Sequence, residues 1–93
     1  MIARIRFFGD LQDYTRKSWT TLEVKQGSTI LDLILQLAEN LNPDLSNKIL
    51  MMKEIRPEIK VLLNGRNIAH LKGLMTELRD HDLVSFLPIA GGG

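Results

Sequence analysis

The sequence has no cysteine, few aromatic residues and almost no net charge. Without cysteine, the 93-residue chain can have no disulfide framework, no thiolate metal site and no cysteine nucleophile. Twelve basic and eleven acidic side chains give a formal charge of +1, so no long-range field would attract nucleic acid or an anionic membrane. No apolar run approaches the roughly 18 residues of a membrane-spanning helix, and the N-terminal residues lack the apolar stretch of a signal peptide. These absences predict a soluble, cytoplasmic protein.

The chain does contain enough apolar residues for one modest core. Apolar residues make up 44% and charged residues 25%, a balance that is typical of globular proteins and too apolar for disorder. A chain of this length buries roughly 60–65% of its extended surface. We therefore expect a single domain without a two-lobed active-site cleft.

Alternation of apolar and polar residues predicts five strands. Their ranges are Ile2–Phe8, Trp19–Lys25, Ile59–Leu63, Arg66–Ala69 and Leu83–Leu87. Asn64-Gly65 favours a type I′ hairpin turn, because both residues tolerate positive φ angles. Pro88 is expected to end the last strand, since it has no N–H to donate.

Helical spacing predicts one principal helix after Gly27-Ser28. Thr29 is the expected N-cap, Asp32 can complete a capping box, and a wide apolar stripe runs from Ile30 to Leu41. A shorter helix is expected over residues 44–53, and its inward side chains would be Leu45, Ile49, Leu50 and Met52. Residues 9–18 are interpreted as a polar loop, and residues 70–79 as a turn or a short helical piece. Met51 and Met52 are expected to fill the core.

The last residues form an unusual ending. Gly91, Gly92 and Gly93 have no side chains to pack, so residues 89–93 are predicted to be a flexible tail behind a domain of residues 1–88. Beyond Pro88 the tail could reach roughly 17 Å at about 3.4 Å per residue. From the tail alone, the alternative of a disordered end or a cloning remnant stays open.

Four segments carry a resemblance that spans nearly the whole chain. They are Ile5-Arg6-Phe7-Phe8-Gly9-Asp10-Leu11, Gly27-Ser28-Thr29-Ile30-Leu31-Asp32-Leu33-Ile34, Val61-Leu62-Leu63-Asn64-Gly65-Arg66, and Leu78-x-Asp80-x-Asp82-x-Val84-x-Phe86-x-Pro88 followed by Gly92-Gly93. They resemble the ubiquitin-like β-grasp sulfur carriers, most closely the small subunit of molybdopterin synthase. The resemblance implies an α+β, ubiquitin-like β-grasp fold, with a mixed β-sheet of about four to five strands packed on one main helix plus a short second helix.

Three positions depart from the family pattern. His81 stands where the family usually has glycine, and histidine tolerates positive φ better than most side chains. Ile89 replaces a frequent second proline, and Gly91 adds a glycine before the usual pair. None of these changes removes Gly92-Gly93.

The resemblance implies that the reactive group is the C-terminal carboxylate of Gly93. A partner of the ubiquitin-activating type would adenylate it with ATP and Mg²⁺, and a sulfur donor would then displace AMP to leave a thiocarboxylate. The sulfur would pass to a pterin precursor inside the large subunit of molybdopterin synthase. On this view the chain is not an enzyme alone, and it binds no cofactor itself.

Strand alternation also predicts a docking patch at the start of the tail. Phe8 and Leu87 would face away from the helix, next to Pro88 and Ile89, and such an apolar patch is typical of a partner-binding surface. Alternatively, the loop of residues 9–18 covers these side chains.

Three other functions fit the same sequence. They are a sulfur carrier for thiamine or tRNA thiolation, a protein modifier that is joined to lysines through Gly93, and a ubiquitin-like adaptor with an unused tail. Asp80 and Asp82 are expected to cap a turn. His70 and His81 lack neighbouring ligands at metal-binding spacing, so no metal site is expected.

Overall fold

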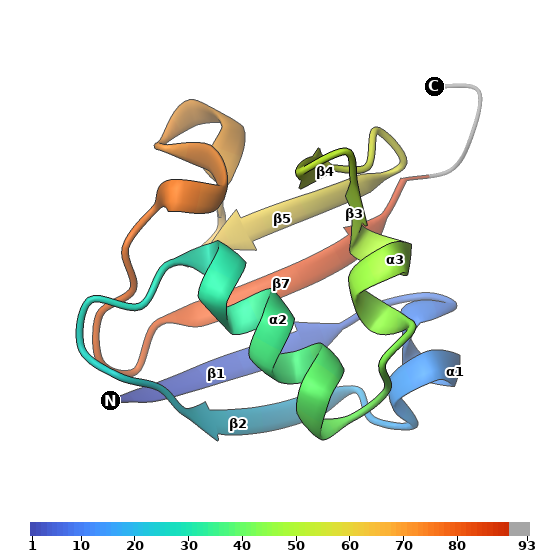
Figure 1. The fold of residues 1–93 in the computed structure, drawn as a ribbon, viewed down its shortest axis with the longest axis horizontal. Helices are drawn as coiled ribbons and strands as arrows, with labels where there is room; N and C mark the ends of the chain where they lie inside the picture. The colour runs from blue at the N-terminus through green and yellow to red at the C-terminus, as the bar shows by residue number, and fades with distance from the viewer. Residues whose placement is uncertain (90–93) are drawn as a thin grey trace.

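The structure is a computed structural model, and it describes residues 1–89. Five strands form one mixed sheet in the order β2-β1-β7-β5-β6, with β1 and β7 parallel at its centre and the other pairs antiparallel (Figure 1). The strands are β1 (Ile2–Phe7), β2 (Trp19–Glu23), β5 (Ile59–Leu63), β6 (Arg66–Asn67) and β7 (Leu83–Pro88). This is the predicted α+β, ubiquitin-like β-grasp architecture.

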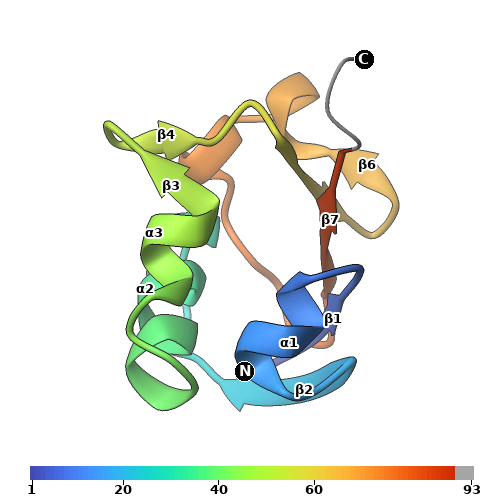
Figure 2. The same ribbon diagram turned by 90° about the vertical axis from the view of Figure 1, so that its right-hand side faces the viewer.

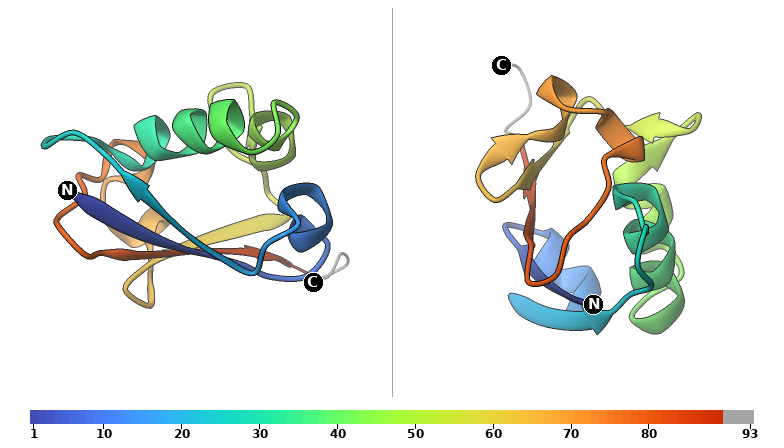
Figure 3. Two further views of the ribbon diagram at one scale, coloured as in Figure 1. Left: turned by 90° about the horizontal axis from the view of Figure 1, so that it is seen from below. Right: turned by 90° about the vertical axis from the view of Figure 1, so that its left-hand side faces the viewer.

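Helix α2 (Ile30–Asn40) covers one face of the sheet, so the molecule has two layers (Figure 3). The predicted capping box is present. The Asp32 N–H donates to the Thr29 hydroxyl (3.3 Å), and the Thr29 N–H donates to the Asp32 carboxylate (2.9 Å). The two bonds satisfy backbone donors that a helix N-terminus otherwise leaves free.

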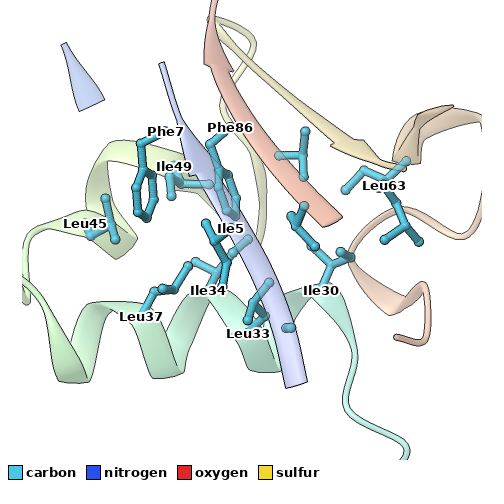
Figure 4. Close-up of a cluster of buried hydrophobic side chains, with 14 of the residues drawn as sticks. Ile5, Phe7, Ile30, Leu33, Ile34, Leu37, Leu45, Ile49, Leu63 and Phe86 are labelled. Carbon is cyan, nitrogen blue, oxygen red and sulfur yellow. The ribbon is translucent and has the colours of Figure 1, made fainter. Parts of the chain in front are cut away.

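The core lies between α2 and the two central strands (Figure 4). Ile5 and Phe7 of β1 and Val84 and Phe86 of β7 are fully buried, as alternation predicted. The rings of Phe7 and Phe86 stack with centroids 5.8 Å apart. Burial of each such side chain stabilises the fold by about 1.5–3 kcal/mol. These four buried side chains therefore determine which face of the sheet packs against the helix.

The predicted second helix is shorter than expected. Helix α3 spans Leu45–Ile49, and both end residues are buried as predicted. The prediction for its second half was wrong: Leu50 is extended, and residues 50–55 form the hairpin of β3 (Leu50–Met51) and β4 (Glu54–Ile55). Hairpin pairing, together with the Arg56 N–H bond to the Ile49 carbonyl (2.8 Å), occupies backbone groups that another helical turn would need.

The two methionines of this hairpin do not fill the core. Met51 is 43% exposed and Met52 is 90% exposed. The sheet face is already covered by α2 and α3, so the apolar run of residues 49–52 buries only its first side chain fully.

Several smaller segments differ from the predicted boundaries. The expected loop of residues 9–18 contains helix α1 (Leu11–Thr15), whose end residues are buried. The strand expected through Ala69 stops at Asn67, and a 3₁₀ turn, η1 (Ile68–His70), follows it. A second 3₁₀ turn, η2 (Gly73–Met75), agrees with the short helical piece expected there.

Turn chemistry was predicted more accurately. Asn64 and Gly65 have φ angles of 51° and 86°, as the type I′ turn requires. His81 also adopts a positive φ of 66°. The Asp82 carboxylate accepts the Arg79 N–H (2.7 Å), so it caps this turn as expected. Among the described residues, no helix is both long enough and apolar enough to span a membrane.

Candidate functional site at the end of strand β7

Strand β7 carries the chain out of the sheet between β1 and β5. The strand continues one residue beyond its predicted end, because Pro88 still pairs with Ile59. The Ile89 N–H then donates to the Glu58 carbonyl (2.7 Å). Pro88, the last residue of the predicted domain, and Ile89, the first residue of the predicted tail, are therefore anchored to β5. The predicted reactive residue Gly93 and the predicted tail residues Gly91 and Gly92 lie outside the described residues.

Gly9 makes room for this chain end. Its φ is +59°, and a Cβ at this position would lie 2.8 Å from Cγ of Pro88. Both the backbone angle and the close approach disfavour any side chain at this position. Sequence reasoning assigned Gly9 to a motif but missed this contact. The only signal in the sequence was a glycine directly after an apolar strand. Such a glycine indicates a turn, but it does not identify Pro88 as the residue that the turn contacts.

The structure separates the four residues of the predicted docking patch: Phe8 and Leu87 lie on the sheet face opposite α2, whereas Pro88 and Ile89 line a hollow beside α1 and α3. Phe8 and Leu87 are partly exposed, while their neighbours Phe7 and Phe86 are buried, so the predicted strand faces are correct. Helix α1 lies at this end of the sheet, beside β1 and β7 (Figure 2), and buries Leu11 in the core on the α2 side. The loop of residues 9–18 therefore leaves Phe8 and Leu87 partly exposed.

The Arg6 side chain, rather than the loop of residues 9–18, covers part of Phe8. The Arg6 guanidinium carbon lies 4.8 Å from the ring centroid of Phe8 and 4.8 Å from that of Trp19 on β2. Two aromatic faces on one guanidinium form a double cation–π contact, which orders these side chains without burying them. The patch is thus apolar toward β7 and carries an aromatic–arginine stack toward β2.

Two hollows flank Ile89, which is 42% exposed and lines both. One, of about 430 Å³, lies between α1, α3 and the start of β5. The other, of about 590 Å³, lies between the β3–β4 hairpin, β5 and the two 3₁₀ turns. The start of the tail is thus surrounded by surface that a partner can contact on three sides: the patch and the two hollows.

The smaller hollow holds a lysine whose charge is stabilised. Lys48 Nζ lies 4.7 Å from the centroid of the Tyr14 ring. The Tyr14 side chain, and to a smaller extent Asp44, raise the pKa of Lys48. Lys48 therefore remains a cation throughout the physiological pH range.

One histidine contacts a carboxylate in the structure, but it lies far from the start of the tail. Within residues 1–89, no cluster of histidine, aspartate and glutamate could hold a metal ion. His81 Nε2 lies 3.6 Å from the Asp80 carboxylate, but both are at the opposite end of the sheet from Ile89.

Several known proteins are similar to this chain in sequence and in structure over most of its length. The model of the ThiS family matches residues 5–93. Small archaeal modifier protein 3 of Haloferax volcanii is 32% identical over 93 residues, which cover 99% of this chain and all of that protein.

Two solved structures are similar over the full chain. The solution structure of the Haloferax volcanii HVO 2177 protein has a TM-score of 0.86 at 30% identity, covering 100% of this chain and 87% of that one. The small archaeal modifier protein 1 of Methanosarcina acetivorans has a TM-score of 0.83 at 28% identity, covering 99% and 96%. The chain belongs to the ThiS family of ubiquitin-like β-grasp sulfur carriers.

Proposed function

We propose that this protein carries sulfur as a thiocarboxylate on its C-terminal glycine, Gly93, as the small subunit of molybdopterin synthase. The observation that carries the proposal is the family match over residues 5–93, which includes Gly92-Gly93. The position of the tail supports the proposal, because β7 ends beside exposed surface that a partner can bind. The reactions would take place in the cytoplasm.

The chemistry needs an external activating enzyme. An α-carboxylate has a pKa of about 3.5, so it is ionised at neutral pH and is a poor electrophile. A carboxylate oxygen would attack the α-phosphorus of ATP on the adenylating partner, with Mg²⁺ neutralising the released pyrophosphate. A donor of sulfide-level sulfur, such as hydrosulfide, would then attack the acyl carbon, form the C–S bond and expel AMP. In the large subunit the thiocarboxylate sulfur would bond to a carbon of the pterin precursor, and water would cleave the acyl C–S bond, which leaves the sulfur on the pterin and returns the Gly93 carboxylate.

The docking patch of Phe8, Leu87, Pro88 and Ile89 would bind these partners. We expect Phe8→Asp and Leu87→Asp to weaken binding to the adenylating enzyme by about 10-fold or more, because each places a charge at the centre of an apolar contact. Thr21→Asp is the matched control, since it adds the same charge to an exposed position on β2. An equal effect of all three substitutions would contradict the assigned patch.

Intact mass spectrometry of the protein from its own host tests the carrier function. A fraction of the chains should be heavier by the difference between sulfur and oxygen. Addition of one alanine after Gly93 should abolish this species and leave folding unchanged, because the chain then no longer ends in glycine. A mature chain without a terminal glycine, or a full-length chain that is never thiolated beside an active partner, would refute the proposal.

Metabolic readouts separate the destinations of the sulfur. If the molybdopterin assignment is correct, cells without the gene should lack molybdopterin and regain it with the wild-type gene only. Loss of thiamine or of thiolated tRNA instead would assign the carrier to one of those pathways. Unchanged function after the addition of one alanine to Gly93 would indicate an adaptor with an unused tail.

Protein modification is the second candidate, favoured by the full-length similarity to small archaeal modifier protein 3. The same activated Gly93 carbonyl can be attacked by a lysine amine, which forms an isopeptide bond and releases the activating group. Digested host proteins should then carry Gly93 remnants on lysines. Their absence beside a detectable thiocarboxylate would leave sulfur transfer as the function.

A further inference from the structure

We propose that the β3–β4 hairpin and the hollow beside it form a second docking element, which binds an acidic, apolar-anchored segment of the adenylating partner. The hollow of about 590 Å³ between the hairpin, β5 and the 3₁₀ turns is called the hairpin groove below. The inference rests on the proposed function, because the partner is the enzyme that activates Gly93. It adds a contact that the sheet-face patch does not include.

The hairpin turn holds two side chains in an unfavourable backbone region. Met51 pairs with Glu54, so Met52 and Lys53 form a two-residue turn with φ angles of 52° and 66°. Side chains other than glycine, asparagine and aspartate rarely occupy this region. Such strain persists where the residues serve another purpose, so it indicates a functional position.

Met52 is the most exposed large apolar side chain among the described residues, at 90%. A flexible thioether at the tip of a hairpin suits insertion into an apolar pocket of another protein. The base of the hairpin is held in place, because Arg56 donates to the Asn47 carbonyl and its Nη1 lies 3.7 Å from Met51 Sδ. The tip is therefore presented by a fixed base.

The hairpin groove itself is positively charged over an apolar floor. Four cations and one carboxylate line it, namely Lys53, Arg56, Lys60, Lys72 and Glu54. None of the four cations forms a salt bridge within residues 1–89. The floor includes the buried side chains of Val61 and Ile68. This combination is complementary to a segment that brings carboxylates and one apolar anchor.

The lining also favours a protein over a nucleic acid as the occupant. No aromatic residue lines the hairpin groove, so it has no platform on which bases could stack. Its position connects it to the proposed reaction, because Ile89 lines the groove at the start of the tail. A partner that receives the tail can therefore contact the groove in the same complex.

Two variants of the full chain test the electrostatic part. Binding to the adenylating enzyme of the same organism is measured at about 50 mM and about 500 mM NaCl. Lys53→Gln/Lys72→Gln should bind about 10-fold more weakly at low salt and within about 2-fold of wild type at high salt. The matched control Lys17→Gln/Lys25→Gln removes the same charge from exposed positions outside the groove and should stay within about 2-fold throughout.

A third variant tests the apolar anchor. Met52→Asn removes the thioether and places a residue that tolerates positive φ at the tip. We expect binding about 10-fold weaker at both salt concentrations, because the lost contact is apolar, together with an unchanged or higher melting temperature. A purely structural role for Met52 would leave the affinity unchanged.

The outcomes separate this inference from the proposed function. If wild-type chain supports ATP–pyrophosphate exchange and the groove and tip variants bind like wild type, the second docking element is refuted and the carrier function stands. If sedimentation shows a dimer that Met52→Asn dissociates without altering partner affinity, the occupant is a second copy and the inference is wrong. If wild-type chain supports no exchange with an active enzyme, the proposed function fails, and this inference fails with it.

Discussion

The two ends of the sheet are held together in different ways. At the end distant from the tail, the Asn64 amide donates to the Asp82 carboxylate (2.9 Å) and accepts the Leu83 N–H (2.8 Å). Asp80 accepts the Ile2 N–H (2.8 Å) at the same end. At the tail end, a backbone hydrogen bond joins Ile89 to Glu58, Gly9 fits closely against Pro88, and Met52 is exposed in a strained turn.

This difference indicates how stability and function are divided. The two hairpin turns have the same signs of φ, yet Asn64-Gly65 is the favoured solution and Met52-Lys53 is not. The Asn64 side chain of the favoured turn bonds to Asp82 and Leu83, so it ties the end of β5 to the start of β7. The strained Met52-Lys53 turn, the most exposed large apolar side chain of residues 1–89 and a groove lined by four cations lie near the point where the chain leaves the sheet, as expected for a surface kept for partners.

The largest effect should come from breaking the network at the distant end. Asn64→Ala removes two hydrogen bonds, one to a carboxylate, and places a Cβ-bearing residue with no local side-chain partner at positive φ. We expect a loss of about 2–3 kcal/mol in the free energy of unfolding, measured by urea denaturation.

The control for this change is Asn64→Gly, which keeps the positive φ accessible and removes only the hydrogen bonds. It should lose about 1–2 kcal/mol. If Asn64→Ala cost less than about 0.5 kcal/mol, the distant end would not be the hydrogen-bonded anchor described here.

Gly9→Ala should give the next largest effect and measures the steric fit at the tail end. The added methyl group meets Pro88 Cγ at 2.8 Å and also disfavours the positive φ. We expect about 2 kcal/mol of destabilisation, or a melting temperature lower by roughly 8–16 °C. Gly27→Ala is a matched control, because its φ is +83° and nothing lies within 4 Å of the new Cβ.

The control should lose only about 1 kcal/mol, the part due to φ alone. Equal losses for the two glycines would mean that Pro88 moves aside freely. The start of the tail would then not be held by Gly9.

The fold was predictable where local patterns and packing agree. Alternation identified the buried faces of β1 and β7, and Thr29 with Asp32 marked the start of α2 correctly. The second half of the short helix was not predictable. Residues 49–52 are consecutive apolar residues, a pattern without a period, so the choice between helix and hairpin depended on space that α2 and α3 had already filled.

The candidate site was predictable only in part. The patch residues Phe8 and Leu87 followed from strand alternation, which the structure confirms. The close approach of Gly9 to Pro88, the Arg6 stack and the hairpin groove all join residues from separate elements. Each depends on strand register and loop placement, which no local window of the sequence specifies.

A smaller effect of opposite sign should follow from giving the strained turn the favoured sequence. Met52→Asn/Lys53→Gly matches the chemistry of the Asn64-Gly65 turn and should raise the free energy of unfolding by about 1 kcal/mol. Lys53→Gly alone should give about half of this gain. A loss of stability in either variant would show that the side chains of the original turn contribute contacts that outweigh its strain.

The smallest effect concerns pH at the distant end. The Ile2 N–H bond, followed by the charge of His81, lowers the pKa of Asp80, so the ionised carboxylate favours the folded state. This stability is present above the ordinary pKa of aspartate and is lost as pH falls through the lower folded value. Between about pH 5 and pH 2, the urea midpoint of Asp80→Asn should therefore fall slightly less than that of wild type. Asp13→Asn, at an exposed position on α1, is the control. A steeper fall for Asp80→Asn than for wild type would contradict the assigned hydrogen bond.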